Sequence, residues 1–90
     1  MRYIKATWVH NFDDEPVLYY QELDNANFEV RKIVIYKDGH SEIASEQFSN
    51  ETTYLSPKPL PNIDEINSDP QFAAKEITKH EFEMKWNDLE

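Results

Sequence analysis

Short hydrophobic runs dominate the first half of the chain and predict β-strands. Residues 3–9 alternate so that Ile4, Ala6 and Trp8 share one face, which we expect to pack against a helix. Residues 17–23 and 28–36 form two further candidate strands. The second of these is apolar on both faces near its end, which favours an interior position in a sheet. Residues 41–44 alternate more regularly, as expected of a strand with one solvent-exposed face.

A short turn between two of these runs predicts a β-hairpin. Asp38-Gly39 separates residues 33–36 from residues 41–44, and a type I′ turn there requires positive φ at both central positions. The other connections are also short, so the four strands are expected to form an antiparallel meander. The longest break, residues 11–16, carries three consecutive acids and is expected to be exposed.

The second half of the chain carries helix signals instead. Residues 56–61 are expected to form an extended, polyproline-like crossing. Asn62, with Glu65 three residues later, is the pattern of a capping box and predicts a short helical turn. Residues 72–77 are compatible with either a helix or a short edge strand.

A longer helix is predicted at the C-terminus. Thr78 is its expected N-cap and Glu81 closes the capping box. Apolar residues then recur on one face at Phe82, Trp86 and Leu89. The sequence therefore predicts one α+β domain over residues 1–90, in which a four-stranded antiparallel sheet carries the C-terminal helix and the helical turn on one face. The uncovered face is expected to expose tyrosines such as Tyr3 and Tyr36.

Composition and charge exclude several classes of protein. The 90 residues include 18 Asp and Glu against nine Lys and Arg, a formal charge of −9, with 13% aromatic residues. A disordered acidic tail would contain fewer aromatics, and a nucleic-acid-binding protein would show a basic stripe. The chain has no cysteine, no apolar run long enough to span a membrane and no signal-peptide core after Met1. We therefore expect a cytoplasmic protein that binds neither nucleic acid nor membrane.

The acids occur in runs that no base opposes. Residues 6–30 hold six acids without any Lys or Arg, and aromatic side chains lie beside several of them. Unopposed negative charge attracts basic partners, and aromatic side chains are efficient interface anchors. A purely solvated surface is the alternative explanation of the charge. The candidate partner-binding residues are Phe12, Asp13, Asp14, Glu15, Tyr19, Tyr20, Glu22 and Asp24.

Signatures of catalysis are nearly absent. A single glycine excludes a glycine-rich phosphate loop, and no Gly-x-Ser-x-Gly motif is present. His10 beside Asp13, Asp14 and Glu15 could hold a hard cation in a small metal-dependent hydrolase, but the spacing is not that of an EF-hand. We expect no enzyme, no cofactor and no metal site.

Segments with strand, turn and cap signals are spread over almost the whole chain, namely Met1-Arg2-Tyr3-Ile4-Lys5-Ala6-Thr7-Trp8, Asp14-Glu15-Pro16-Val17, Glu22-Leu23-Asp24, Arg31-Lys32-Ile33-Val34-Ile35-Tyr36-Lys37-Asp38-Gly39, Ile63-Asp64-Glu65-Ile66-Asn67 with Asp69-Pro70, and Ile77-Thr78-Lys79-His80-Glu81-Phe82 with Trp86. In these segments the chain resembles a family of small, functionally uncharacterised bacterial domains of about this length. The resemblance runs almost from end to end and implies no catalytic residues. In size and charge alone, such domains are similar to the immunity proteins of bacterial toxin systems.

These observations favour an acidic intracellular interaction protein. We expect an immunity or inhibitor protein that binds and neutralises a basic toxin such as a nuclease, with carboxylates in place of nucleic-acid charge. The alternative is a general protein-interaction module, or a homodimer formed through the uncovered face of the sheet.

Overall fold

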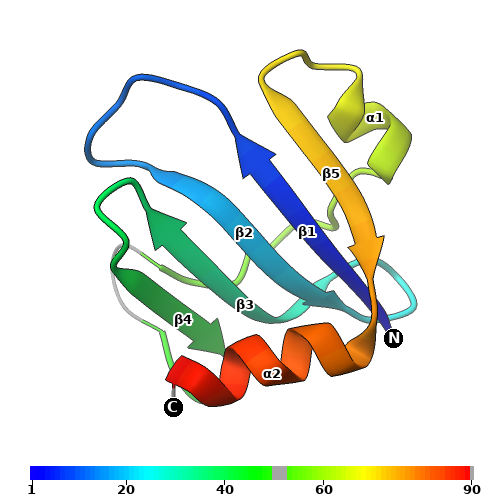
Figure 1. Cartoon of the computed structure of the whole chain (residues 1–90). Helices are drawn as coiled ribbons and strands as arrows, with labels where there is room; N and C mark the ends of the chain where they lie inside the picture. The colour runs from blue at the N-terminus through cyan, green and yellow to red at the C-terminus, as the bar shows by residue number, and fades with distance from the viewer. Residues whose placement is uncertain (50–52, 90) are drawn as a thin grey trace.

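An antiparallel sheet of five strands forms the centre of the computed structural model, which describes residues 1–49 and 53–89 (Figure 1). The strand order is β4-β3-β2-β1-β5, so β2 lies in the middle and β4 and β5 form the edges. One short and one longer helix complete the fold. The elements are β1 (Arg2–Trp8), β2 (Pro16–Leu23), β3 (Glu29–Tyr36), β4 (Ser41–Ser45), α1 (Ile63–Asn67), β5 (Phe72–Ile77) and α2 (Lys79–Leu89).

The meander of β1 to β4 confirms the predicted order of strands, but the predicted number of four is wrong. Residues 72–77, which the sequence left ambiguous, form the edge strand β5. This strand runs antiparallel to β1, with Phe72 opposite Trp8 and Ile77 opposite Tyr3. By intrinsic propensity, a helix is favoured by four successive residues of this segment, Ala73, Ala74, Lys75 and Glu76. The unpaired edge of β1 overrides that propensity because pairing satisfies the backbone groups of both strands.

Helix α2 packs on the face of the sheet that carries Tyr3. The strand register places Tyr3 opposite Glu22 and Lys5 opposite Tyr20, so these side chains share a face. The fully buried Phe82 and the buried Trp86 contact Tyr3, Tyr20 and Ile33 there to form the core. The prediction that the helix covers Ile4, Ala6 and Trp8 is therefore wrong.

The expected tyrosine-bearing exposed face is also absent from the described residues. Tyr3 is 8% exposed and Tyr36 is 9% exposed. The ring of Tyr3 lies 5.4 Å from the ring of Phe82, while its hydroxyl donates a hydrogen bond to Glu22. Tyrosine supplies a large apolar ring and needs one partner for its hydroxyl, so it can be buried where the sequence suggested a polar position.

Helix α1 lies on the opposite face of the sheet from α2. It packs along β5, and Ile66 lies over a floor formed by Ala6 and Gln21. The segment that precedes α1 crosses this face and is fastened where the Leu60 amide donates to the Asn27 carbonyl at 2.8 Å. The prediction that both helices cover one face is thus wrong, because α1 and α2 bury different faces.

The predicted helix caps are confirmed. The side-chain oxygen of Asn62 accepts a hydrogen bond from the Glu65 backbone amide at 2.9 Å, and the side-chain amide of Asn62 donates to the Glu65 carboxylate at 3.3 Å. At the start of α2, the Glu81 amide donates to the Thr78 hydroxyl at 3.1 Å. These local interactions satisfy helix N–H groups that have no partner within the helix.

The β3–β4 hairpin is confirmed, although its turn type differs from the prediction. Gly39 has φ of +94°, whereas Asp38 is not among the described residues with positive φ. The Gly39 amide donates to the Tyr36 carbonyl and the Tyr36 amide donates to the His40 carbonyl, each at 2.9 Å. This pattern is a type I turn followed by a left-handed glycine, not a type I′ turn. Glycine is favoured there because side chains at positive φ are strained.

Candidate functional site

The loop between β1 and β2 carries the strongest candidates for partner binding. Asp13, Asp14 and Glu15 are exposed there, and Phe12 beside them is 58% exposed. Among the described residues, the only ion pair that these three carboxylates make joins Asp13 to Lys37 at 3.7 Å. Such an exposed pair contributes little to stability, so the carboxylates remain available to a partner.

His10 holds this loop in shape. Its Nδ1 accepts a hydrogen bond from the Phe12 amide at 3.0 Å, while Nε2 lies 2.8 Å from the Pro16 carbonyl. Since the amide can only donate, we assign the neutral tautomer that carries its proton on Nε2. The imidazole also contacts the ring of Trp8, with 4.2 Å between centroids. Both ring nitrogens are therefore used within the loop.

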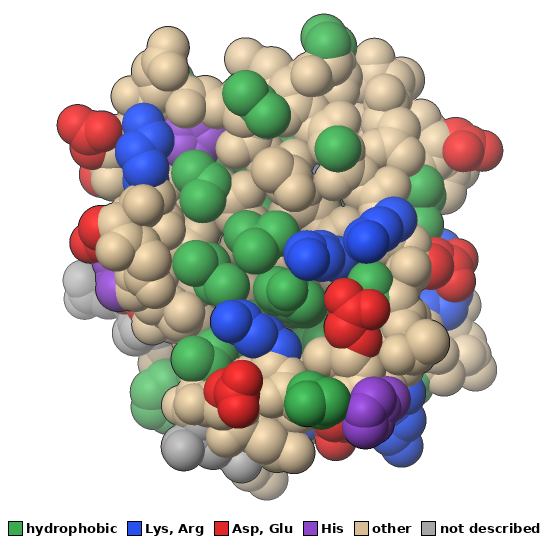
Figure 2. All heavy atoms as spheres, in the orientation of Figure 1, with side chains coloured by type: hydrophobic (Ala, Val, Ile, Leu, Met, Phe, Trp, Pro, Cys, Tyr) green, Lys and Arg blue, Asp and Glu red, His purple; other side chains and the backbone are tan. Residues whose placement is uncertain are grey.

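The β3–β4 hairpin brings a fourth carboxylate to the same end of the sheet. Asp38 accepts a hydrogen bond from the His40 amide at 3.0 Å, and this bond, together with the His40 side chain, holds the pKa of Asp38 below its ordinary value. The ring of His40 stacks on Tyr36 at 4.2 Å. We call Asp13, Asp14, Glu15 and Asp38 the acidic end. In Figure 2, acidic side chains lie along the edge where this loop and hairpin meet.

Tyr19 lies close to the acidic end, on the face that α1 covers. It lines one hollow with Glu15 and a second one with Trp8. Burial, and then the nearby charge of Glu15, raise the pKa of Tyr19 to about 12. Its hydroxyl is therefore a neutral hydrogen-bond donor at neutral pH rather than a group that exchanges protons.

Two of the remaining candidates are buried on the α2 face. Tyr20 lies in the core beneath α2, with the Lys5 ammonium 5.4 Å from its ring centroid. Glu22 is 5% exposed and belongs to an internal polar network. Neither of these side chains forms part of the exposed acidic surface.

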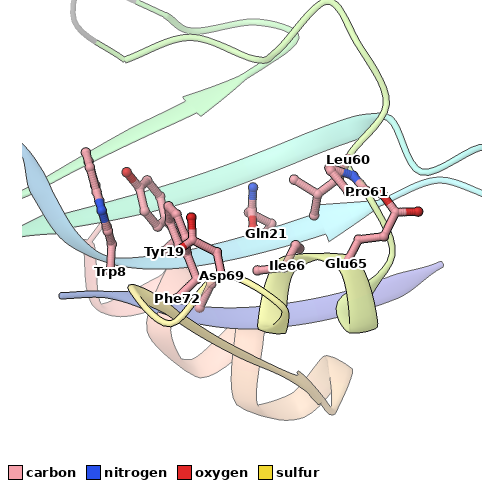
Figure 3. A pocket seen from close by; sticks show the side chains of 10 residues that line it. Trp8, Tyr19, Gln21, Leu60, Pro61, Glu65, Ile66, Asp69 and Phe72 are labelled. Atoms are coloured by element: carbon pink, nitrogen blue, oxygen red, sulfur yellow. The ribbon is translucent and has the colours of Figure 1, made fainter.

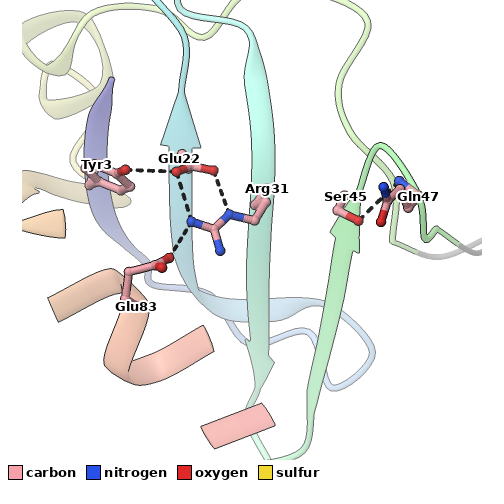
Figure 4. Close-up of polar contacts among 6 residues, drawn as sticks. All are labelled: Tyr3, Glu22, Arg31, Ser45, Gln47 and Glu83. Atoms are coloured by element: carbon pink, nitrogen blue, oxygen red, sulfur yellow. Dashed lines mark hydrogen bonds and ion pairs between the residues drawn. The ribbon is translucent and has the colours of Figure 1, made fainter. Parts of the chain in front are cut away.

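Figure 4 shows the network that holds Glu22. Its carboxylate accepts hydrogen bonds from Arg31 Nε at 2.6 Å, from Arg31 Nη2 at 2.9 Å and from the Tyr3 hydroxyl at 2.9 Å. Arg31 also pairs with Glu83 on α2 and lies 4.9 Å from the ring centroids of both Phe82 and Trp86. The bonds from Arg31 lower the pKa of Glu22, and the bond to Glu22 raises that of Arg31. Both groups therefore stay charged and fasten α2 to the sheet.

Asp24 lies at the opposite end of the sheet from the acidic end. Its Oδ1 accepts hydrogen bonds from the amides of Ala26 at 2.9 Å and Phe28 at 3.0 Å, which shape the β2–β3 loop. Asn27 in this loop adopts positive φ of 68°. Of the eight predicted residues, the structure gathers five near one end of the sheet, namely Phe12, Asp13, Asp14, Glu15 and Tyr19.

Comparison with known proteins places the chain in a family. The model of a family described as a domain of unknown function, DUF6881, matches residues 2–90. The chain belongs to this family. The resemblance to a small uncharacterised domain is thus confirmed. No curated protein and no solved structure matches this DUF6881 domain.

Among residues 1–49 and 53–89, no three or more histidines or acids are grouped so that they could bind a metal ion. No helix in those ranges is long and apolar enough to cross a membrane.

An aromatic cluster next to the acidic end was missed by the sequence reasoning. Trp8 stacks on Phe72 with 5.7 Å between ring centroids, and Phe12 lies 6.3 Å from Trp8. The alternation of β1 assigned Trp8 to the face beneath the main helix, and the ambiguous segment 72–77 gave no partner for it. Knowing that this segment was the edge strand beside β1 would have revealed the pair.

Proposed function

We propose that this DUF6881 domain is an acidic interaction protein that binds a basic protein through its acidic end. The specific form of the proposal is an intracellular inhibitor, or immunity protein, of a basic toxin such as a nuclease. The observation that carries it is the exposed ring of Phe12 next to three carboxylates, of which only Asp13 has an ion-pair partner among the described residues. An apolar anchor surrounded by unopposed charge is suited to a charged partner.

The proposed inhibition is electrostatic and steric. A nuclease cleft is lined by basic side chains that bind phosphates, so Asp13, Asp14 and Glu15 would take the place of phosphate groups. The formal charge of −9 would speed the encounter, and Phe12 would slow dissociation by burying its ring. Nucleic acid would then be excluded from the cleft.

The local chemistry supports binding over catalysis. The ring nitrogens of His10 are engaged by the loop itself, and the pKa of Tyr19 is raised to about 12. A general acid or base needs a pKa near the operating pH and a free position toward the substrate. Neither His10 nor Tyr19 meets both conditions.

The test compares two triple variants of equal net charge. D13N/D14N/E15Q removes the carboxylates of the loop, whereas E46Q/D64N/D88N removes three exposed carboxylates elsewhere. Each variant changes the formal charge from −9 to −6. Tagged protein is incubated with lysate of the native host at low salt, and bound proteins are eluted along a salt gradient and identified.

We expect the wild type and the control variant to retain one basic protein to intermediate salt, and the loop variant to lose it early. Equal elution from both variants would contradict the assignment of the loop, because only general charge would matter. A broad set of basic proteins eluting together from all three samples would contradict specific inhibition.

A homodimer through the α2 face is the second candidate. Helix α2 crosses only one end of this face, and Figure 2 shows hydrophobic side chains gathered on the sheet above it, between basic ones. Leu18, Ile35 and Ile43 are partly buried there. In the same capture experiment, an untagged copy of the chain retained regardless of salt would favour this candidate.

A further inference from the structure

A groove of about 400 Å³ lies between α1 and the sheet, on the face opposite α2 (Figure 3). We call it the α1 groove. Its floor is formed by β1 and β2, and its walls by α1, the start of β5 and the segment before α1. The side chains that matter for its chemistry are Trp8, Tyr19, Gln21, Glu65, Asp69 and Phe72.

One end of the α1 groove is aromatic. Trp8 and Phe72 face each other across the β1–β5 pair, with their rings 13° from parallel, and Tyr19 lies at the same end. Faces of aromatic rings attract cations, and most strongly where water is partly excluded. The buried indole N–H of Trp8 has no hydrogen-bond acceptor among the described residues. The NMR signal of this N–H reports changes in the surroundings of the Trp8 ring at this end of the groove.

The charged groups that line the α1 groove are all acidic. Asp69 lies beside Tyr19 and Phe72, whereas Glu65 lies at the far end next to Pro61 (Figure 3). None of the described lining residues is Lys or Arg. Two carboxylates without a base favour a cationic ligand and disfavour an anion.

The polar floor can complete the recognition of a ligand that donates several hydrogen bonds. The amide group of Gln21 donates to the Glu29 carboxylate at 2.7 Å. Of the two polar atoms of this carboxamide, only the carbonyl oxygen can accept a hydrogen bond from a ligand. The acidic oxygens and this carbonyl suit a ligand with planar, forked N–H donors.

We propose that the α1 groove binds an arginine side chain of the basic partner, stacked on Trp8 and Phe72 and paired with Asp69. The inference rests on the proposed function, which supplies the partner, and it names the side chain that the partner presents. Guanidinium stacks on aromatic faces and pairs with carboxylates through two N–H groups, whereas the lysine ammonium is more strongly hydrated.

The α1 groove adjoins the acidic end, so one partner can contact both. Trp8 contacts Phe12, which precedes the acidic run, and Tyr19 lines both the groove and the hollow that contains Glu15. A basic surface steered by the acidic end would thus place an arginine beside the groove.

The test uses three blocked amino acids as probes and the whole protein labelled with ¹⁵N. N-acetyl-arginine amide should shift the indole signal of Trp8 and the amide signals of Asp69 and Phe72 at millimolar concentration. The citrulline analogue is a neutral isostere of arginine and should bind about 10-fold more weakly because it lacks the positive charge. A tenfold loss of affinity corresponds to about 1.4 kcal/mol. The lysine analogue should also bind more weakly. The indole of Trp86, beneath α2, is the internal control.

Matched variants locate the binding. D69N should weaken binding of the arginine probe about 5-fold, a loss at the upper end of the range for an exposed ion pair such as Asp69 would form. D64N, which removes an exposed carboxylate of α1 outside the groove, should leave the affinity unchanged.

Shifts confined to residues 13–15, equal binding of arginine and citrulline, or no effect of D69N would each overturn the proposal. These results are separable from the proposed function, because the probe experiment contains no partner protein. If the loop variant loses the captured protein while the probe fails to bind, the groove assignment alone is wrong. If the probe binds and the loop variant behaves as the control variant does, the proposed function alone is wrong.

Discussion

Replacing Glu22 by glutamine should destabilise the domain far more than an ordinary surface substitution. Glu22 is 5% exposed and its carboxylate accepts two hydrogen bonds from Arg31 and one from Tyr3. Breaking a buried ion pair costs about 3–5 kcal/mol. Glu83 remains as a second partner and the Arg31 side chain is 21% exposed, so E22Q should cost about 2–3 kcal/mol.

Urea unfolding of wild type, E22Q and E83Q measures this difference. Glu83 pairs with the same guanidinium, but its side chain is 36% exposed, so E83Q should cost less than about 1 kcal/mol. The expected loss for E22Q corresponds to a fall in Tm of about 10–20 °C for a domain of this size. An E22Q variant within about 0.5 kcal/mol of wild type, or one no less stable than E83Q, would refute the reasoning.

Two further predictions follow from the polar contacts. Arg31 holds the pKa of Glu22 below its ordinary value of 4.5, so the unfolded chain binds more protons than the folded chain as pH falls below that value. In urea titrations at a series of pH values, the stability difference between wild type and E22Q should therefore be constant near pH 7 and shrink below pH 4.5. A stability difference that stays constant down to pH 3 would contradict this prediction. The Asn67 side chain donates a hydrogen bond to the Ala74 carbonyl at 2.9 Å and accepts one from the Ala74 amide at 2.6 Å. N67A should therefore lower the free energy of unfolding by about 1–2 kcal/mol in urea titrations, and it should expose the edge of β5 to self-association, which sedimentation would detect. Equal behaviour of N25A, a control in an exposed loop, would contradict this prediction.

Local features of the fold could be predicted from the sequence. The hairpin at Asp38-Gly39 and the caps at Asn62 and Thr78 depend on a few neighbouring residues, and all three occur in the structure. The exposed loop with Asp13, Asp14 and Glu15 could be predicted for the same reason, since consecutive charges are rarely buried.

Features that depend on distant partners could not be predicted in the same way. Segment 72–77 becomes a strand because β1 offers it an unpaired edge. The residues within the segment do not show that this edge is available. Both faces of β1 carry residues that can be buried, so the alternation of Tyr3 and Ile4 could not decide which face receives α2. The prediction reversed the two faces as a result.

The candidate site likewise contains residues whose surroundings depend on partners that are distant in the sequence. Glu22 was grouped with the surface acids because residues 6–30 contain no Lys or Arg, whereas its partner Arg31 lies opposite it on the neighbouring strand β3. Its burial became evident only when the register placed the two side chains opposite each other. Trp8 and Phe72 likewise meet only through the pairing of β1 with β5.

The most direct test of the acidic end as a binding surface is the association rate of the captured basic protein as a function of ionic strength. The account predicts that D13N/D14N/E15Q associates about 10-fold more slowly than wild type at low salt, within the range of electrostatic steering, and that E46Q/D64N/D88N changes the rate much less. The difference between the two variants should vanish at high salt because the charges are screened. Equal association rates for the two variants at low salt would contradict the account, since only the net charge, and not its position at the acidic end, would then govern binding.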